Sequence, residues 1–77
     1  MNSENINKLK EIIAKYAKTE VEKLDLNADF KNDLHLDSID LFQMIMEAEE
    51  TFKIKIENSQ LLKIKTINDA INIIQNA

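Results

Sequence analysis

The sequence predicts an all-α fold: a four-helix bundle with three main helices, one short third helix and a long first loop. Apolar residues recur at three- and four-residue spacing in separate stretches, which is the period of an amphipathic helix. Only residues 52–56 alternate with the period of a strand, and the sequence shows no partner strand for them. We therefore interpret 52–56 as an extended connection within a helical bundle.

The first helix is predicted over residues 3–17. Its apolar face comprises Ile6, Leu9, Ile12, Ile13, Tyr16 and Ala17. Residues 18–36 do not keep this spacing. Their apolar side chains are spaced as in a long loop that contacts the core at intervals, and we call them anchors. These anchors are Val21, Leu24, Leu26, Phe30, Leu34 and Leu36. A loop of this length without structure of its own is unusual and is often functional.

The second helix is expected to begin at Asp37-Ser38 and to end near Thr51. At 100° per residue, one face gathers the residues expected in the core: Leu41, Met44, Ile45, Ala48 and Phe52. A second apolar stripe lies roughly 140° away. It consists of Ile39, Phe42 and Met46, and we call it the second stripe. Two interpretations stay open: burial of this stripe under the loop, or an exposed docking surface.

Two further helices complete the bundle. Asn58 or Ser59 is expected to cap a short third helix that runs through Leu61, Leu62 and Ile64. Thr66 and Asp69 resemble a capping box that opens the last helix. That helix has Ile67, Ala70, Ile71 and Ile74 on one face.

Composition indicates one small domain, residues 1–77, expected to be monomeric and cytoplasmic. Cysteine, glycine, proline and tryptophan are all absent, so no disulfide is possible. The polar N-terminus does not resemble a signal peptide, and no apolar run approaches the roughly 20 residues that span a bilayer.

The net charge of −4 is concentrated in one segment. Between Lys31 and Lys53 there is no Lys or Arg. The segment contains six acids: Asp33, Asp37, Asp40, Glu47, Glu49 and Glu50. Such a segment repels nucleic acid and attracts basic protein surfaces, although a merely solvated helix face is the simpler alternative.

The sequence lacks the residues that two kinds of functional site require. A catalytic triad cannot be assembled, because His35 is the only histidine and there is no cysteine. We interpret His35 as a loop residue that tolerates positive φ. A calcium-binding EF-hand loop would begin at Asp25. Phe30 stands where that loop requires glycine, and Leu36 stands where it requires glutamate. No metal site is therefore predicted.

Ser38 has two interpretations. On composition alone it is an ordinary residue of a helix start. If Asp37 caps the helix instead, the Ser38 hydroxyl is presented at the positive end of the helix, where a phosphate group is favoured.

Asp37-Ser38-Ile39 resembles the Asp-Ser-Leu signature of acyl carrier proteins, in which the serine bears a 4′-phosphopantetheine arm. The similarity extends over nearly the whole chain, most clearly residues 27–74. It includes Asn27-Ala28-Asp29-Phe30, Asp33-Leu34, Glu49-Glu50-Thr51-Phe52 and Lys63-Ile64-Lys65-Thr66-Ile67.

The resemblance implies a carrier of the acyl-carrier fold rather than an enzyme. Ser38 would receive 4′-phosphopantetheine from coenzyme A through a phosphopantetheinyl transferase, and Asp37 and Asp40 would help to position the transferase. Acyl-transfer and chain-elongation enzymes of fatty-acid synthesis would present basic patches to a docking surface. That surface would contain Ile39, Asp40, Phe42, Met46, Glu49 and Glu50. The arm would carry acyl chains as thioesters, and the apolar interior would shelter them.

Four positions depart from the family pattern. They are His35 for glycine, Gln43 for an acid, Glu47 for a small or apolar residue, and Glu57 for proline. None touches the attachment chemistry. They leave open whether the chain is a fatty-acid carrier or a specialised carrier for a polyketide or other pathway. A non-acylated helical interaction module with the same acidic surface is a separate alternative.

Overall fold

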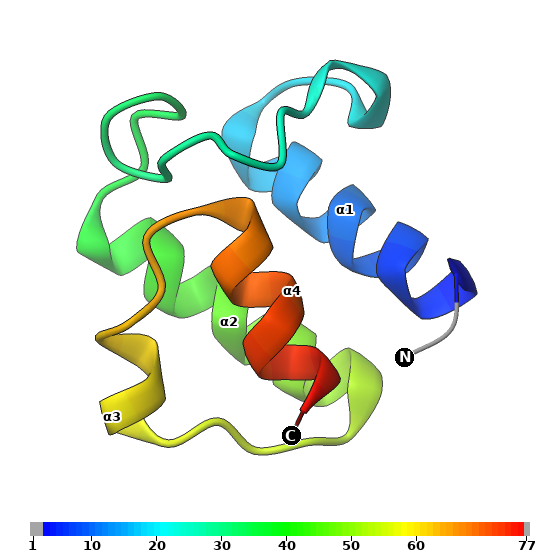
Figure 1. The fold of residues 1–77 in the computed structure, drawn as a ribbon, viewed down its shortest axis with the longest axis vertical. Helices are drawn as coiled ribbons and strands as arrows, with labels where there is room; N and C mark the ends of the chain where they lie inside the picture. The colour runs from blue at the N-terminus through cyan, green and yellow to red at the C-terminus, as the bar shows by residue number, and fades with distance from the viewer. Residues whose placement is uncertain (1–2, 77) are drawn as a thin grey trace.

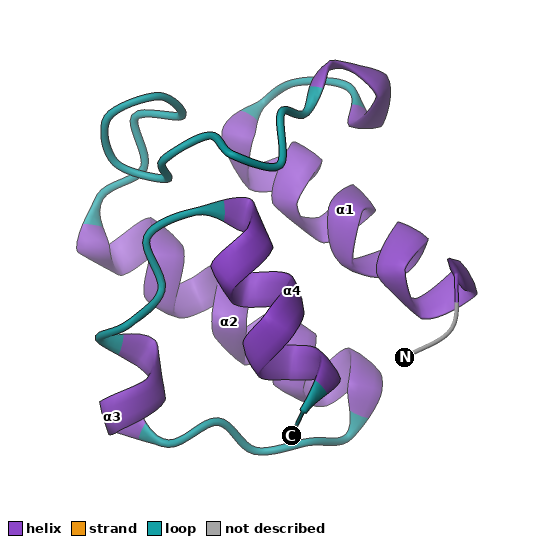
Figure 2. Cartoon of the chain, in the orientation of Figure 1, coloured by secondary structure: helices purple, strands orange, loops and turns teal. Residues whose placement is uncertain are grey.

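The computed structural model describes residues 3–76 and is helical, as predicted. In chain order the elements are α1 (Ser3–Ala17), the 3₁₀ turn η1 (Val21–Lys23), α2 (Ser38–Phe52), α3 (Asn58–Leu61) and α4 (Ile67–Gln75). Figure 1 shows α1, α2 and α4 as the main helices, with the short α3 at one edge. The long connection between α1 and α2 crosses one end of the bundle (Figure 2). Among residues 3–76, no helix is both long and apolar enough to cross a membrane.

The starts of α2 and α4 follow from their capping residues. Asp37 Oδ1 accepts the Asp40 N–H at 2.8 Å, and Asp40 Oδ2 accepts the Asp37 N–H at 3.4 Å. Thr66 and Asp69 form the corresponding pair at α4. Each pair satisfies N–H groups that a helix start leaves without intrahelical partners. The predicted capping box of α4 is confirmed. For α2 the sequence left the cap open between Asp37 and Ser38, and the structure has Asp37 in that role.

Three turns require the left-handed backbone conformation in a chain that has no glycine. Lys18, His35 and Lys53 adopt φ values of 57°, 59° and 55°. The positive φ predicted for His35 is therefore confirmed. Lys53 is the C-cap of α2, and its N–H donates to the Glu49 carbonyl at the point where the helix ends.

The long connection is held by backbone pairing with the start of α4. The Phe30 N–H donates to the Lys65 carbonyl at 2.8 Å, and the Asn68 N–H donates to the Leu26 carbonyl at 2.9 Å. Asp29 and Thr66 form an isolated antiparallel bridge. Phe30 lies 1% exposed in the core, which confirms the anchor interpretation for this residue.

Two details of the prediction are wrong. The connection is not structureless, because it contains the 3₁₀ turn η1. The N-cap of α3 is Glu57 rather than Asn58 or Ser59, and the Glu57 N–H donates to Gln60 Oε1 at 3.2 Å. The helix consequently begins at Asn58 and ends at Leu61, so it does not run through Leu62 and Ile64 as predicted. Leu62 is largely exposed.

Most of the predicted core face of α2 is confirmed. Met44, Ile45 and Ala48 are buried, while Leu41 and Phe52 are half-buried against the same cluster. The cluster also includes Leu9, Ile12 and Ile13 from α1 and Ile67, Ala70, Ile71 and Ile74 from α4. Burial of these apolar side chains joins the three main helices.

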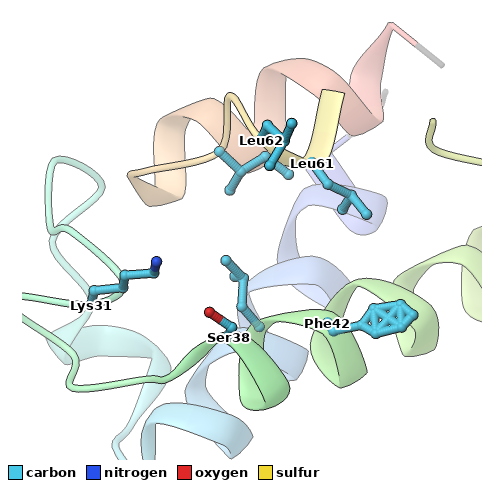
Figure 3. A pocket seen from close by; sticks show the side chains of 7 residues that line it. Lys31, Ser38, Phe42, Leu61 and Leu62 are labelled. Atoms are coloured by element: carbon cyan, nitrogen blue, oxygen red, sulfur yellow. The ribbon is translucent and has the colours of Figure 1, made fainter. Parts of the chain in front are cut away.

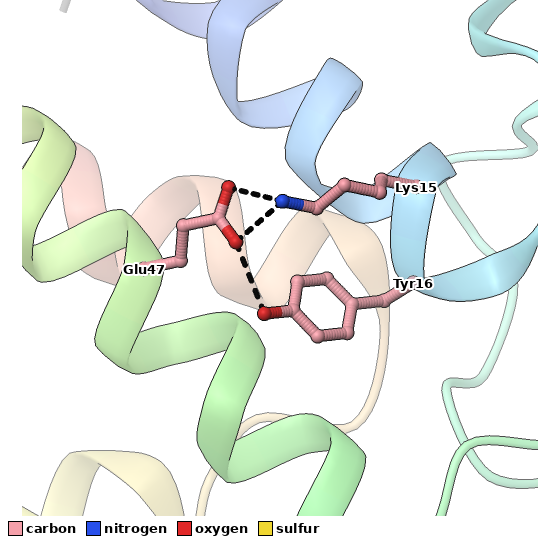
Figure 4. Close-up of polar contacts among 3 residues, drawn as sticks. All are labelled: Lys15, Tyr16 and Glu47. Carbon is pink, nitrogen blue, oxygen red and sulfur yellow. Dashed lines mark hydrogen bonds and ion pairs between the residues drawn. The ribbon is translucent and has the colours of Figure 1, made fainter.

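Glu47 ties α2 to α1 (Figure 4). Its two carboxylate oxygens each lie 2.7 Å from Lys15 Nζ, and Tyr16 donates its hydroxyl to Oε1 at 3.0 Å. The hydrogen bond to Glu47 raises the pKa of Lys15 and of Tyr16, and the hydrogen bond from Lys15 lowers the pKa of Glu47. This interhelical contact gives the Glu47 carboxylate a structural role between α1 and α2.

Glu47 and Asp69 lead us to expect a loss of stability in acid. Backbone N–H groups of Thr66 and Lys65 lower the pKa of Asp69. Both carboxylates therefore stabilise the fold above their ordinary pKa values of 4.5 and 3.8. That contribution is lost as the pH falls through the lower folded-state values. Urea melts at a series of pH values from neutral downward measure the free energy of unfolding. This free energy should depend less steeply on pH in Glu47→Gln and in Asp69→Asn than in wild type.

The exposed Glu11 on α1 supplies the matched control. Glu11→Gln should follow the wild-type pH dependence. An unchanged slope in both Glu47→Gln and Asp69→Asn would show that neither interaction contributes to folding.

Candidate functional site

Ser38 is the first residue of α2 and is exposed. Because the Asp37 carboxylate caps the helix, the serine hydroxyl is not needed for that role. The side chain stands where the helix dipole is positive, which favours a negatively charged substituent. The structure thus presents an accessible hydroxyl at a position suited to a phosphate ester.

The second stripe is exposed. Ile39 is 67% exposed, Phe42 51% and Met46 47%, so the alternative of burial under the 18–36 loop is excluded. Apolar side chains of this size in a short strip beside acids are typical of protein contact surfaces.

The predicted acidic residues differ in what their carboxylates contact. Asp37 and Asp40 form the capping box of α2, as described above. Glu49 Oε2 accepts the Ile56 N–H at 2.8 Å, so this residue holds the connection after α2. Glu50 is exposed on the same helix. Glu49 therefore has a structural contact that sequence alone did not reveal, whereas Glu50 is accessible to a partner.

An open hollow of about 230 Å³ lies beside Ser38. Figure 3 shows Leu61 and Leu62 on one side of it and Ser38 and Phe42 on the other, with Lys31 reaching in from the long connection. Leu41 and Ile64 complete the lining. The walls are mainly apolar, which suits a flexible aliphatic group that leaves Ser38 along this surface.

Sequence reasoning missed Lys31 and Leu62 as parts of this site. Leu62 is 85% exposed, and the sequence placed it on the short third helix without relating it to Ser38. Lys31 lies seven residues before Ser38 in a loop, where no helical spacing relates the two. The only available signal was that Lys31 is the last basic residue before the acidic segment.

The carboxylates of the long connection are engaged in turns. Asp29 Oδ1 accepts the N–H groups of Lys31 and Asn32 at 2.8 and 2.9 Å, and Asp33 Oδ2 accepts the Asp29 N–H at 2.7 Å. Within residues 3–76 no group of three potential metal-binding side chains converges. These acids shape the loop in front of Ser38.

The fold and the site together define a class: small helical domains that present one serine at a helix start, between an apolar hollow and an exposed apolar stripe with acids at its margin. Comparison with known families agrees. Residues 7–74 match the family model described as the phosphopantetheine attachment site. The chain belongs to the acyl carrier protein family of phosphopantetheine-dependent carriers.

Two relatives show how far the similarity extends. The chain is 39% identical to an acyl carrier protein of Aster yellows witches'-broom phytoplasma (strain AYWB) over 64 residues, which cover 83% of this chain and 84% of that protein. It is 38% identical to the acyl carrier protein of Lactobacillus acidophilus over 76 residues, covering 97% and 95%.

Solved structures agree with the fold. A putative acyl carrier protein from Mycobacterium tuberculosis superposes with a TM-score of 0.86 at 28% identity, covering 94% of this chain and 96% of that one. The acyl carrier protein from Enterococcus faecalis gives a TM-score of 0.78 at 28% identity, covering 96% and 95%. The predicted fold class and carrier function are thereby confirmed.

Proposed function

We propose that Ser38 is the attachment residue for 4′-phosphopantetheine and that the loaded carrier serves fatty-acid synthesis. The observation that carries the proposal is the exposed Ser38 hydroxyl at the start of a helix that Asp37 already caps. The residues present fit the group: the positive end of α2 would favour its phosphate, and the apolar hollow would suit its aliphatic portion. The apolar lining comprises Leu41, Phe42, Leu61, Leu62 and Ile64.

The thiol of the arm supplies thioester chemistry when it is bound, and the protein chain itself presents and delivers the acyl group. A phosphopantetheinyl transferase is the proposed donor enzyme, with coenzyme A as its substrate. Asp37 and Asp40 lie beside Ser38 and would orient that enzyme. The membership in the acyl carrier family supports this role, and we place the carrier with cytoplasmic synthesis enzymes.

Intact-mass spectrometry tests the attachment. The purified protein is incubated with a broad-specificity transferase, coenzyme A and magnesium. We expect the mass to rise by one phosphopantetheine, and peptide mapping should place the addition on Ser38. A protein that gains no mass under conditions that load a known acyl carrier would contradict the proposal.

We further propose that partner enzymes dock on the second stripe and on Asp40, Glu49 and Glu50. Three exposed apolar side chains with acids at their margin match the pattern of a small interface with electrostatic steering. Because Glu49 also holds the connection after α2, Glu50 is the better position at which to test charge alone.

Glu50→Lys is expected to slow acyl transfer to a partner enzyme, chiefly by lowering the association rate. Wild-type turnover should decrease as salt rises, and turnover of the variant should decrease less, because salt screens an attraction that the variant has partly lost. Transfer rates across a salt series measure both effects.

Glu22→Lys is the matched control, because it makes the same charge change at an exposed position of η1. It should retain the wild-type salt dependence. If Glu50→Lys and Glu22→Lys respond to salt equally, the acidic surface of α2 does not steer docking.

A further inference from the structure

The hollow beside Ser38 has two polar side chains in its lining, Ser38 itself and Lys31. Figure 3 shows the Lys31 side chain extending from the long connection, with its amino group directed into the space between Ser38 and Leu62. In the same view the hydroxyl of Ser38 is directed toward the side from which Lys31 enters. A cationic group therefore shares the mouth of the hollow with the proposed attachment atom.

The backbone at Lys31 is well fixed. Its own N–H donates to Asp29 Oδ1 at 2.8 Å, and the preceding residue, Phe30, is buried in the core. Phe30 is also bonded through its backbone on both sides, donating to the Lys65 carbonyl at 2.8 Å and accepting the Leu36 N–H at 2.9 Å. The last of these bonds brings the segment that carries Lys31 close to the start of α2. The fold therefore positions Lys31 beside the hollow.

Neighbouring carboxylates do not account for the direction of the Lys31 side chain. The ion pairs recorded within residues 3–76 are Lys15–Glu47 and Lys23–Glu20, and neither includes Lys31. The acids nearest in sequence, Asp29 and Asp33, each accept backbone N–H groups. A positive charge here also opposes docking of basic partners, so a role in that surface does not explain it.

We propose that Lys31 is a positioning residue that pairs with the phosphodiester of the prosthetic group and holds the base of the arm over the apolar hollow. The inference rests on the proposed attachment at Ser38. Esterification of the hydroxyl fixes a permanent anion within a few bonds of Ser38, on the side of the hollow that Lys31 faces. A lysine ammonium forms charge-assisted hydrogen bonds with phosphate oxygens, and its methylene stem packs along apolar walls.

The test compares phosphopantetheine-loaded wild type with Lys31→Met, Lys31→Arg and Lys63→Met. Lys31→Met removes the charge and keeps an apolar stem, and Lys31→Arg keeps the charge. Lys63→Met makes the same charge change at an exposed lysine that does not line the hollow. Both positions, Lys31 and Lys63, are exposed, so all three variants should fold. Intact mass first establishes loading of each protein.

Phosphorus NMR then reports on the phosphodiester. We expect Lys31→Met to shift its resonance by more than the line width, and Lys31→Arg and Lys63→Met to leave it near the wild-type position. Added salt should move the wild-type resonance toward that of Lys31→Met, because screening weakens an exposed pair. In lysine-labelled protein, loading should shift the side-chain amino signal of Lys31 and leave that of Lys63 unchanged.

The outcomes separate the two proposals. If wild type gains no phosphopantetheine on Ser38, the proposed function fails and this inference fails with it. If loading is complete but Lys31→Met has the wild-type phosphorus resonance, only the pairing of Lys31 is overturned. An equal shift in Lys63→Met would overturn it as well, because the effect would then be one of net charge.

Discussion

Ser38→Ala is expected to abolish loading with phosphopantetheine, with no gain in mass where wild type gains one group. Alanine has no oxygen to form the phosphate ester. The fold should be retained, because Ser38 is exposed and the cap of α2 belongs to Asp37. Its stability should change by no more than about 0.5 kcal/mol, as at ordinary surface positions. Intact mass and circular dichroism measure the two parts of this expectation.

Ser59 provides the matched control, because it is a second exposed serine in the first turn of a helix, α3. Ser59→Ala should load as wild type does. If Ser38→Ala is still loaded, or if Ser59→Ala is not, the attachment site is not at the start of α2. Unfolded Ser38→Ala would instead show that the hydroxyl has a structural role that the geometry does not indicate.

The features that the sequence predicted correctly depend on local relationships. The core face of α2 follows from spacing along one helix, and so does the separation of the second stripe from that face, although spacing left open whether the stripe is exposed. The capping box of α4 depends on two residues three apart, Thr66 and Asp69. These relationships are set within a few turns of chain, so they can be derived without knowing how the helices pack.

The features that the sequence did not reveal depend on contacts between distant segments. Glu47 meets Lys15 and Tyr16 because α1 and α2 pack together, and nothing in its local sequence indicates this contact. The Glu49 side chain bonds Ile56 only after the chain reverses at Lys53. Their identities suggested solvated or docking carboxylates, and tertiary structure assigns them interactions within the protein.

Lys31 shows the same limit at the site itself. Its place beside Ser38 depends on pairing between the long connection and the residues that precede α4, through Phe30 and Lys65. A mutation that weakens this pairing should therefore displace one wall of the hollow while leaving the start of α2 intact. The attachment residue is positioned locally, and its surroundings are positioned by the whole fold.

Met44→Ala is expected to destabilise the fold by about 2–5 kcal/mol, the range for truncating a buried methionine. Met44 is 0% exposed and packs in the cluster that joins α1, α2 and α4. A natural domain has roughly 5–15 kcal/mol of stability in total, so the loss is large for a chain of this size. Urea melts should show a lower midpoint with an unchanged slope.

Met46→Ala, two residues further along α2, is expected to behave in the opposite way. Met46 is 47% exposed on the second stripe, so truncation should change stability by no more than about 0.5 kcal/mol. Acyl transfer to partner enzymes should nevertheless weaken, because an apolar anchor with charged neighbours is where binding energy concentrates. The two methionines have the same chemistry and lie on the same helix, so the comparison isolates the face that each occupies. If Met46→Ala unfolds at the same urea concentration as Met44→Ala and transfers normally per folded molecule, the second stripe contributes to the core and partner enzymes dock elsewhere.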